Sequence, residues 1–378
     1  MQVQILFSSM TIQSTLNEES KQALALIARQ IASPGKGILA ADESTGTIQK
    51  RFDTISVANT EANRAAYRSL LFKAKSLGNY ISGAILYDET LHQKNAMGES
   101  MISLLEAQGI IPGIKVDSGL VNLPGTDEEK FTEGLDGLGK RCANYYKAGA
   151  RFAKWRAALS IDVAKNKPSN IAISAVTQGL AHYARVCQEN GLVPIVEPEI
   201  LSDGPHSIET CAEVMDLPRY DLERVLVAQY KALSDYGVFL EGTLLKPNMV
   251  TSGSEYAPKS DPETVGYYTA RVLRRGVPAA VPGIMFLSGG QSEEESSLNL
   301  NAICKREGSP WVVSFSFGRA LQASCLKAWR GRAENETIAQ EELLKRANAN
   351  SLAQLGKYSG GFSGDAASAS LFEKKYVY

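Results

Sequence analysis

Cysteine and histidine are scarce in this chain, and neither forms a recognisable disulfide or metal-binding pattern. The 378 residues include five cysteines and three histidines. The cysteines are Cys142, Cys187, Cys211, Cys304 and Cys325, widely spaced and without a CxxC pair. An odd number of dispersed thiols predicts free cysteines in a reducing compartment. No two histidines lie within four residues of each other, which argues against a histidine-rich metal site and leaves open a magnesium site made of carboxylates.

Long apolar runs and an excess of either charge are also absent. No run reaches the ~18 residues that a membrane-spanning helix needs. Lys and Arg number 40 against 41 Asp and Glu, so the net charge is -1. The first residues, MQVQILFSSM, contain an apolar patch but no basic residue, which is atypical of secretory signals and transit peptides. We therefore expect a cytoplasmic protein, with the plastid stroma as the alternative, that binds neither nucleic acid nor membranes.

Eight short apolar segments recur along the chain, and each ends in a polar residue or glycine. They are GKGILAADES from Gly35, YISGAILYDE from Tyr80, IIPGIKVD from Ile110, ARFAKWR from Ala150, LVPIVEPE from Leu192, VFLEGTLLKP from Val238, GIMFLSGG from Gly283 and VVSFSFGR from Val312. The interval between successive segments has room for a strand, a helix and two loops. The nearly continuous apolar character is typical of parallel strands that are buried on both faces.

Segments that mix apolar and polar residues lie between the strands and predict helices. They cover residues 61–73, 133–148, 173–189, 208–236, 262–275, 293–304 and 320–329. Ser292, followed by three glutamates, is a strong helix-start signal. Eight strands alternating with helices predict an α/β fold, a (β/α)8 TIM barrel, although periodicity alone leaves a doubly wound open sheet as the alternative.

The pattern divides the chain into three parts. Residues 1–24 form a leader that runs into a first helix, and residues 25–355 form the barrel. Residues 356–378 begin with a stretch rich in Gly, Ser and Ala, which predicts a flexible tail. The tail ends in Tyr376 and Tyr378, and these aromatic side chains have the potential to dock on the barrel.

Charged residues occur inside or at the end of several predicted strands. An isolated buried charge is costly unless it is paired, so several of them in one fold predict a shared site. Barrel active sites lie at the carboxyl ends of the strands. The embedded charges are Lys154, Glu197, Glu199 and Lys246. Any one of them alone is more simply explained as a first loop residue that reaches water.

Lys246 follows Leu244 and Leu245 and precedes Pro247. In an apolar wall beside other cations, a lysine loses its proton more easily, and a neutral amine can attack a carbonyl carbon to form a Schiff base. A structural lysine that bonds backbone carbonyls is the alternative. Glu197 and Glu199 flank Pro198 and form a carboxylate pair suited to acid–base chemistry. The alternative is that they are ion-pair partners of Lys154 and Arg156. The two interpretations are compatible.

Two glycine-containing loops follow the seventh and eighth predicted strands, where barrel enzymes often bind phosphate. SGGQSEEE from Ser288 joins a strand to a helix, and SFGRA from Ser316 places a glycine beside Arg319. Backbone N–H groups at a helix N-terminus form an anion site. A second phosphate site, on the opposite side, is predicted at Lys115, Arg156, Ser44 and Thr47.

The motifs GILAADESTGT, GIKVD, FAKWR, VPIVEPEI, EGTLLKPNMV, FLSGGQSEEE and SFGRALQ, with a terminal tyrosine, closely resemble class I fructose-1,6-bisphosphate aldolase. The resemblance runs from about residue 32 to the end. It implies a reversible, metal-independent and cofactor-free cleavage of fructose 1,6-bisphosphate into dihydroxyacetone phosphate and glyceraldehyde 3-phosphate, and a homotetramer. Alternatives are a Schiff-base aldolase for another phosphosugar, such as sedoheptulose 1,7-bisphosphate, and a scaffold role on filaments.

The resemblance also implies a role for each candidate residue. Lys246 would form the Schiff base, and Glu197 would take the C4 hydroxyl proton. Lys154 and Glu199 would assist formation and dehydration of the carbinolamine, Asp42 would orient the substrate hydroxyls, and Tyr378 would help to protonate the enamine. The C1 phosphate would bind to Ser288, Gly289, Gly318 and Arg319. The C6 phosphate would lie towards Lys115, Arg156, Ser44 and Thr47.

Overall fold

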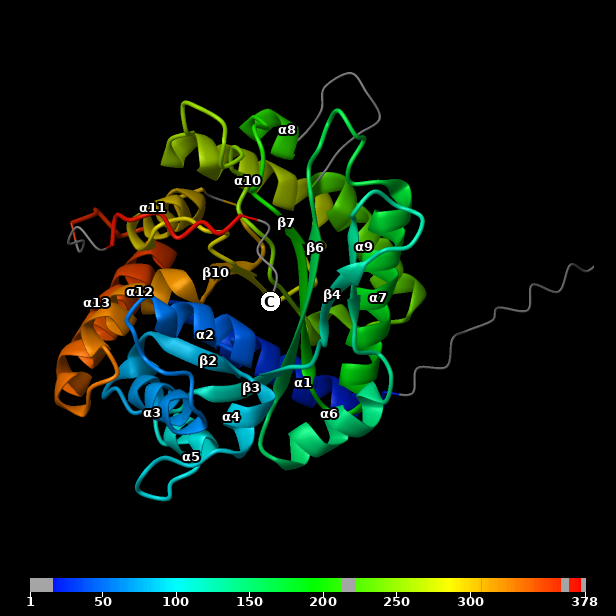
Figure 1. Cartoon of the computed structure of the whole chain (residues 1–378). Coiled ribbons are helices and arrows are strands. Elements are labelled where there is room, and N and C mark those ends of the chain that lie inside the picture. The colour runs from blue at the N-terminus through cyan, green and yellow to red at the C-terminus, as the bar shows by residue number, and fades with distance from the viewer. Residues whose placement is uncertain (1–15, 213–221, 307, 362–366, 375–378) are drawn as a thin grey trace, which may run out of the picture.

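The computed structural model describes residues 16–212, 222–306, 308–361 and 367–374. Eight parallel strands close into a barrel in the order β1-β10-β9-β8-β7-β6-β3-β2 (Figure 1). They are β1 (Gly37–Ala41), β2 (Ile81–Leu86), β3 (Ile111–Lys115), β6 (Phe152–Leu159), β7 (Val193–Ile200), β8 (Leu244–Leu245), β9 (Gly283–Phe286) and β10 (Val312–Phe317). Because β1 pairs with both β2 and β10, the sheet has no edge. The predicted (β/α)8 barrel is confirmed, and the open sheet is excluded.

Helices surround the barrel in the described residues. They are α1 (Glu18–Ile31), α2 (Thr45–Asp53), α3 (Glu61–Phe72), α4 (Asp88–His92), α5 (Met101–Glu106), α6 (Leu138–Lys147), α7 (Asn170–Glu189), α8 (Ile208–Ala212), α9 (Leu222–Asp235), α10 (Pro262–Gly276), α11 (Glu293–Cys304), α12 (Arg319–Trp329) and α13 (Glu336–Gln354). Helix α11 spans the predicted residues, and Ser292 forms a full capping box with Glu295.

Helix α1 packs against the amino-terminal ends of the strands. Its buried residues Leu24, Ala28 and Ile31 join a cluster that includes Phe152 and Val193 from the barrel strands. This cluster is separate from the larger apolar core, which lies mainly between the barrel and its outer helices. The helix continues past residue 24, where we placed the end of the leader, because the apolar spacing that buries it extends to Ile31.

Several elements depart from the prediction. The strand expected from Val238 is reduced to Leu244–Leu245, and a 3-10 turn at Leu240–Gly242 precedes it. The helix expected from residue 133 begins only at Leu138, because residues 130–133 pair as the antiparallel hairpin of β4 (Gly119–Asn122) and β5 (Lys130–Glu133). Gly137, with φ +64°, then starts the helix in a left-handed conformation that favours glycine.

Helix α13 was not predicted, and its packed face explains why. Leu343 and Ala347 are buried, but so are Arg346, Asn350 and Ser351. The side chain of Arg346 pairs with Glu294 at 3.3 Å, and Ser297 donates to Asn350. Since buried polar side chains take the place of apolar ones at this interface, the apolar periodicity that reveals most buried helices is weak here.

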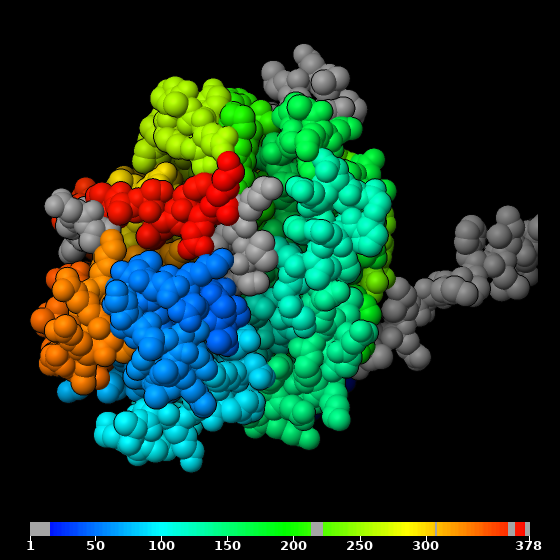
Figure 2. All heavy atoms as spheres, in the orientation of Figure 1, coloured from blue at the N-terminus to red at the C-terminus, as the bar shows by residue number. Residues whose placement is uncertain are grey.

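The described part of the carboxyl-terminal segment is packed against the molecule. The Tyr358 hydroxyl donates to Glu294 at 2.6 Å, and the Glu294 amide donates to the carbonyl of Ala367 at 3.2 Å. In the space-filling view, the segment of residues 367–374 (red) lies across the face between the blue segment that includes α2 and the yellow-green segments above it (Figure 2). Its contacts place it beside loops that follow β9 and β10.

Candidate active site

Four buried side chains form a chain of alternating charge, two from residues that directly follow β1 and β8 and two from within β6 and β7. The Lys154 Nζ lies 2.8 Å from the Asp42 Oδ2 and 3.3 Å from the Glu197 Oε2. The other carboxylate oxygen of Glu197, Oε1, lies 3.0 Å from the Lys246 Nζ. Each of the four residues is at most 2% exposed. Two acids and two bases thus compensate one another, which lowers the cost of burying them.

Strand register explains why these charges face one another. Lys115 is paired with Lys154 across β3 and β6, and Arg156 is paired with Glu197 across β6 and β7. Paired residues of parallel strands point to the same face, and so do residues two apart on one strand. The interior therefore receives Lys154 and Arg156 from one strand and both glutamates from the next.

Glu199 has a different partner from Glu197. Its Oε2 lies 2.5 Å from the Arg156 Nε. Lys115 pairs with Asp117 at 2.6 Å, and the second carboxylate oxygen of Asp117 accepts from the backbone amide of Arg156 at 3.2 Å. The two glutamates thus pair with different cations: Glu197 pairs with Lys154 and Lys246, and Glu199 pairs with Arg156.

Asp42 is held ionised by this arrangement. Burial raises the pKa of its carboxyl, but the nearby ammonium groups of Lys154, Lys246 and Lys115 outweigh this effect and lower the pKa to about 2. The Asp42 carboxylate is therefore charged across the physiological pH range and anchors the Lys154 ammonium.

Two loops that contain the expected glycines border a cavity that is also lined by Lys246 and both glutamates. After β9, Gly289 and Gly290 have φ values of +57° and +86°, a left-handed turn that leads into α11. After β10, Gly318 precedes the first residue of α12, Arg319. The cavity is lined by Lys246, Glu197, Glu199, Ser288, Gly289, Gly318 and Arg319, together with Ala40, Arg51, Leu287 and Ser316. The lysine and both glycine loops thus border one space.

Ser44 and Thr47 lie at the start of α2. Ser44 caps the helix, its side chain accepts from the Thr47 amide, and the two hydroxyls are 3.1 Å apart. The two hydroxyls contact each other, whereas Lys115 pairs with Asp117 and Arg156 pairs with Glu199. Their role in a common phosphate site therefore stays a prediction.

Arg51 and Ser316 line the cavity but were missed from the sequence. Arg51 lies in the last turn of α2, where a basic residue is ordinarily explained by the helix dipole. A Cβ atom built on Gly318 would lie 3.8 Å from the Arg51 Nη2, so the guanidinium approaches the loop after β10. The only sequence signal was the proximity of Arg51 to the motif AADEST, eight residues after Glu43.

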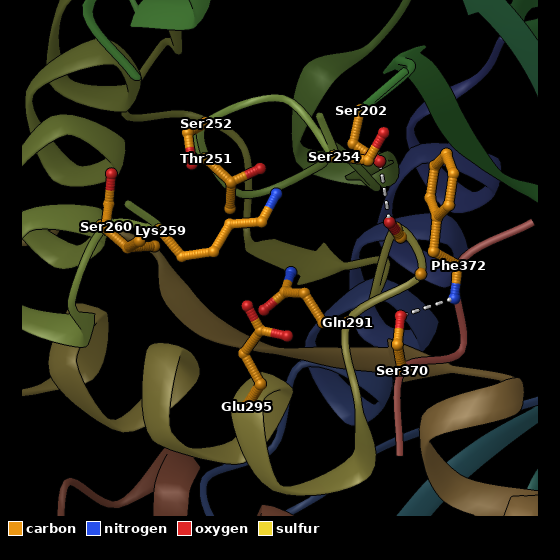
Figure 3. A pocket seen from close by; sticks show the side chains of 13 residues that line it. Ser202, Thr251, Ser252, Ser254, Lys259, Ser260, Gln291, Glu295, Ser370 and Phe372 are labelled. Carbon is orange, nitrogen blue, oxygen red and sulfur yellow. Dashed lines mark hydrogen bonds between the residues drawn. The ribbon is translucent and has the colours of Figure 1, made fainter. Parts of the chain in front are cut away.

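The loop after β9 is held from two sides. The Ser202 hydroxyl donates to the carbonyl of Gly289 at 3.1 Å. Both residues line a polar pocket whose walls also include residues between 251 and 265, Gln291 and Glu295, and Ser370 and Phe372 of the carboxyl-terminal segment (Figure 3). From that segment, the Leu371 amide donates to the carbonyl of Gly290 at 3.2 Å. A Cβ atom on Gly290 would lie 2.9 Å from the Phe372 Cα, so only glycine fits beneath the segment.

The carboxyl-terminal segment also contacts Arg319. The Arg319 guanidinium donates to the carbonyl of Leu371 and lies 3.6 Å from the Glu373 carboxylate. Tyr378, for which we expect a role in protonation, lies outside the described residues. The described residues before it contact Arg319, which lines the cavity.

Comparison with known proteins identifies the family. The family model for glycolytic "Fructose-bisphosphate aldolase class-I" matches residues 23–378. The chain belongs to the class-I fructose-bisphosphate aldolases. A Toxoplasma gondii protein, fructose-bisphosphate aldolase 1, is 63% identical over 96% of this chain and 98% of its own length. A cytosolic fructose-bisphosphate aldolase 5 from Arabidopsis thaliana is 59% identical over 93% of this chain and 96% of its own length.

A solved structure supports the same assignment for this class-I aldolase. The fructose-bisphosphate aldolase of Plasmodium falciparum, in complex with TRAP and a small-molecule inhibitor, has a TM-score of 0.89 and 59% identity. The match covers 92% of this chain and 98% of that chain. Among the described residues of this aldolase, no helix is both long and apolar enough to span a bilayer, and no cluster of three or more His, Cys, Asp or Glu has metal-site geometry.

The low pKa of Asp42 predicts acid sensitivity in this aldolase. A carboxyl whose folded pKa is about 2, against an ordinary 3.8, stabilises the fold above pH ~4 and loses that contribution as the pH falls towards 2. We expect the unfolding free energy to fall by about 2 kcal/mol more than in Asp42→Asn over that interval. Urea unfolding followed by tryptophan fluorescence checks this. Parallel pH profiles of the two proteins would contradict the assigned pKa.

Proposed function

We propose that this class-I aldolase reversibly cleaves fructose 1,6-bisphosphate through a Schiff base on Lys246. The observation that supports this most directly is the position of the Lys246 amine, 3.0 Å from the Glu197 carboxylate in a cavity bordered by both glycine loops. A buried lysine beside a carboxylate has a proton acceptor in reach, and the neutral amine that results is a nucleophile. The glycine loops supply the anion site that a phosphosugar needs.

The first half of the reaction uses the amine and its neighbours. The Lys246 nitrogen attacks the C2 carbonyl carbon, and loss of water from the carbinolamine gives a protonated imine. Lys154 and Glu199 assist the proton transfers of these steps. Lys154 lies between Asp42 and Glu197, and Glu199 is oriented by Arg156.

The second half of the reaction breaks the C3–C4 bond. Glu197 takes the proton of the C4 hydroxyl, the C3–C4 electron pair moves into the imine to form an enamine, and glyceraldehyde 3-phosphate leaves. Asp42 orients the hydroxyls as an ionised acceptor. Tyr378 then helps to protonate C3 of the enamine, and water releases dihydroxyacetone phosphate. The imine acts as the electron sink, so we propose that neither a metal nor another cofactor is required.

Borohydride trapping tests this proposal. The protein is incubated with fructose 1,6-bisphosphate and EDTA, reduced with borohydride and mapped by peptide mass spectrometry. We expect a covalent adduct on Lys246 together with loss of activity. Cleavage without an adduct, or activity that EDTA abolishes, would require a different electron sink.

Substitutions in the two proposed phosphate sites should affect kcat/KM differently for substrates with one phosphate and with two. We propose that Ser288, Gly289, Gly318 and Arg319, together with Arg51, bind the C1 phosphate. Lys115, Arg156, Ser44 and Thr47 lie towards the C6 phosphate in the same proposal. Fructose 1-phosphate lacks the C6 phosphate, so it should report on the first site alone.

Arg319→Met should lower kcat/KM for fructose 1,6-bisphosphate and fructose 1-phosphate alike, by about 10- to 100-fold, because one charge-assisted bond is lost on both substrates. Lys115→Met should lower it for the bisphosphate only. Steady-state kinetics with both substrates measures the two ratios. Equal losses in the Lys115 variant would show that this lysine does not belong to the C6 side.

The assembly and the compartment are also proposals. We propose a homotetramer in the cytoplasm, supported by the family and by the cytosolic Arabidopsis relative. Sedoheptulose 1,7-bisphosphate as the main substrate and a scaffold role on filaments are not favoured, because the relatives are fructose-bisphosphate aldolases by name.

A further inference from the structure

The loop at Gly289 and Gly290 lies between two cavities, and Ser202 contacts it from the outer one. Gly289 lines the catalytic cavity together with Lys246 and Arg319, and it also lines the polar pocket drawn in Figure 3. Ser202 lines that polar pocket, two residues after the end of β7, and its hydroxyl donates to the Gly289 carbonyl at 3.1 Å. The proposed catalytic steps leave Ser202 without a role.

Three successive carbonyls of this loop accept hydrogen bonds from the protein. The Ser288 carbonyl accepts at 3.1 Å from the amide three residues on, and the Gly290 carbonyl accepts at 3.2 Å from the Leu371 amide. The Gly289 carbonyl between them accepts from the Ser202 hydroxyl. The first and third donors are backbone amides, whereas the second is a side chain. A substitution at Ser202 therefore removes one bond of the loop and leaves the other two in place.

The direction of a carbonyl fixes the direction of the amide that follows it. The peptide bond between Gly289 and Gly290 is trans, so its C=O and N–H bonds point in nearly opposite directions. The Gly289 carbonyl points to Ser202 in the polar pocket. The Gly290 N–H therefore points away from that pocket, towards the side on which Gly289 borders the catalytic cavity. A backbone amide on that side is a donor for a phosphate oxygen.

The two glycines make this orientation easy to lose. Their φ values are +57° and +86°, and glycine adopts either sign of φ at little cost. A peptide unit between two glycines can therefore rotate unless a bond holds it. Without the Ser202 hydroxyl, the Gly289 carbonyl can turn towards the catalytic cavity, where its oxygen would repel a phosphate that the amide attracts.

We propose that Ser202 is a positioning residue for phosphate binding, which holds the peptide unit of Gly289 and Gly290 with its amide towards the catalytic cavity. The side chain itself makes no contact with substrate. This inference rests on the proposed C1 phosphate site and deepens it. The group recognised is the phosphate dianion that fructose 1,6-bisphosphate and fructose 1-phosphate share.

Inhibition by inorganic phosphate, measured against fructose 1-phosphate, tests this proposal in Ser202→Ala and in the parent protein. This substrate has only the C1 phosphate, so competition reports on one site. We expect the inhibition constant for phosphate and the KM for fructose 1-phosphate each to rise about threefold to tenfold. The kcat per active site, counted by borohydride trapping, should change much less, because the phosphate is bound in the ground state and the transition state alike. A purely structural role would lower the thermal midpoint or the number of active sites and leave both constants unchanged, which would overturn the proposal.

Ser202→Thr is the conservative variant. It keeps the hydroxyl, and the polar pocket beside it, with a volume of about 150 Å³, has room for the additional methyl group. Both constants should return close to those of the parent protein. Equal losses in Ser202→Thr and Ser202→Ala would contradict the proposal, because the hydroxyl would then not be the group that matters.

Ser254→Ala is the matched control. Ser254 lines the same pocket, and its backbone amide donates to the Ser202 carbonyl at 2.6 Å. Its hydroxyl oxygen is buried and has no hydrogen-bond partner among the described residues. Loss of this hydroxyl should leave both constants unchanged. A rise equal to that in Ser202→Ala would assign the effect to the polarity of the pocket and refute a role for the bond to Gly289.

The outcomes also separate this proposal from the proposed function. Failure of the proposed function would show as absent turnover and trapping in the parent protein. Failure of the present proposal would show as normal turnover and trapping in the parent protein, with an unchanged phosphate constant in Ser202→Ala.

Discussion

Lys246→Arg should reduce cleavage of fructose 1,6-bisphosphate by at least about a thousandfold, although it keeps the positive charge beside Glu197. A guanidinium stays protonated at any working pH and cannot form an imine, whereas it can replace the ammonium as an ion-pair partner. The substitution therefore separates the nucleophile from the counter-ion. Steady-state turnover and borohydride trapping both report on the nucleophile. We expect the variant to lose turnover and to form no trapped adduct.

The structural role of the lysine is examined by a second substitution. Lys246→Met removes the charge as well and leaves Glu197 with Lys154 as its remaining ion-pair partner among the described contacts. We expect it to lower the thermal midpoint, whereas Lys246→Arg should stay closer to the parent protein. Near-normal turnover in Lys246→Arg would refute the Schiff-base assignment, because a structural cation is all that this variant retains.

Glu197→Gln should lower kcat by about 100- to 10,000-fold, because the amide cannot accept the C4 hydroxyl proton. The imine should still form, but more slowly, because the Lys246 amine remains in place while the carboxylate that accepts its proton is lost. Trapping of an adduct on Lys246 without release of aldehyde would therefore mark the step that Glu197 serves. Single-turnover experiments with quenching measure both stages.

Glu199→Gln is the natural comparison for this variant. Glu199 is paired with Arg156, whereas Glu197 is paired with Lys246, so loss of Glu199 should slow the appearance of the trapped adduct more than the cleavage that follows. If Glu197→Gln and Glu199→Gln slowed the same step, the assignment of different steps to the two carboxylates would be wrong. The contacts alone make this distinction, because on one strand the two glutamates look equivalent.

Much of this site was predictable because its signals are local. Lys246 stood out since a lysine after two buried leucines is unusual, and the pairs two residues apart implied a shared face. The loop at Ser288 was recognised by its glycines and by the cap of the next helix. In each case, the information lies within one segment of a few residues.

Other features of the site were not predictable because they depend on contacts between distant segments. Arg51 looks like an ordinary helix-surface cation until Glu43 is placed beside it. The packing of residues 367–374 against Gly290 and Arg319 also has no sequence signal, since a stretch rich in Gly, Ser and Ala is typical of a flexible tail. The polar interface of α13 hid that helix for a similar reason.

By itself, the sequence determined the eight strand segments, the charged residues at their ends and the glycine loops, because hydrophobic periodicity and turn chemistry act over a few residues. Tertiary structure alone decided that the sheet closes on itself, through the pairing of β1 with both β2 and β10. It also decided which cation meets which carboxylate: Lys154 bridges Asp42 and Glu197, while Arg156 pairs with Glu199. These partners come from different strands, so only strand register and burial bring them within bonding distance.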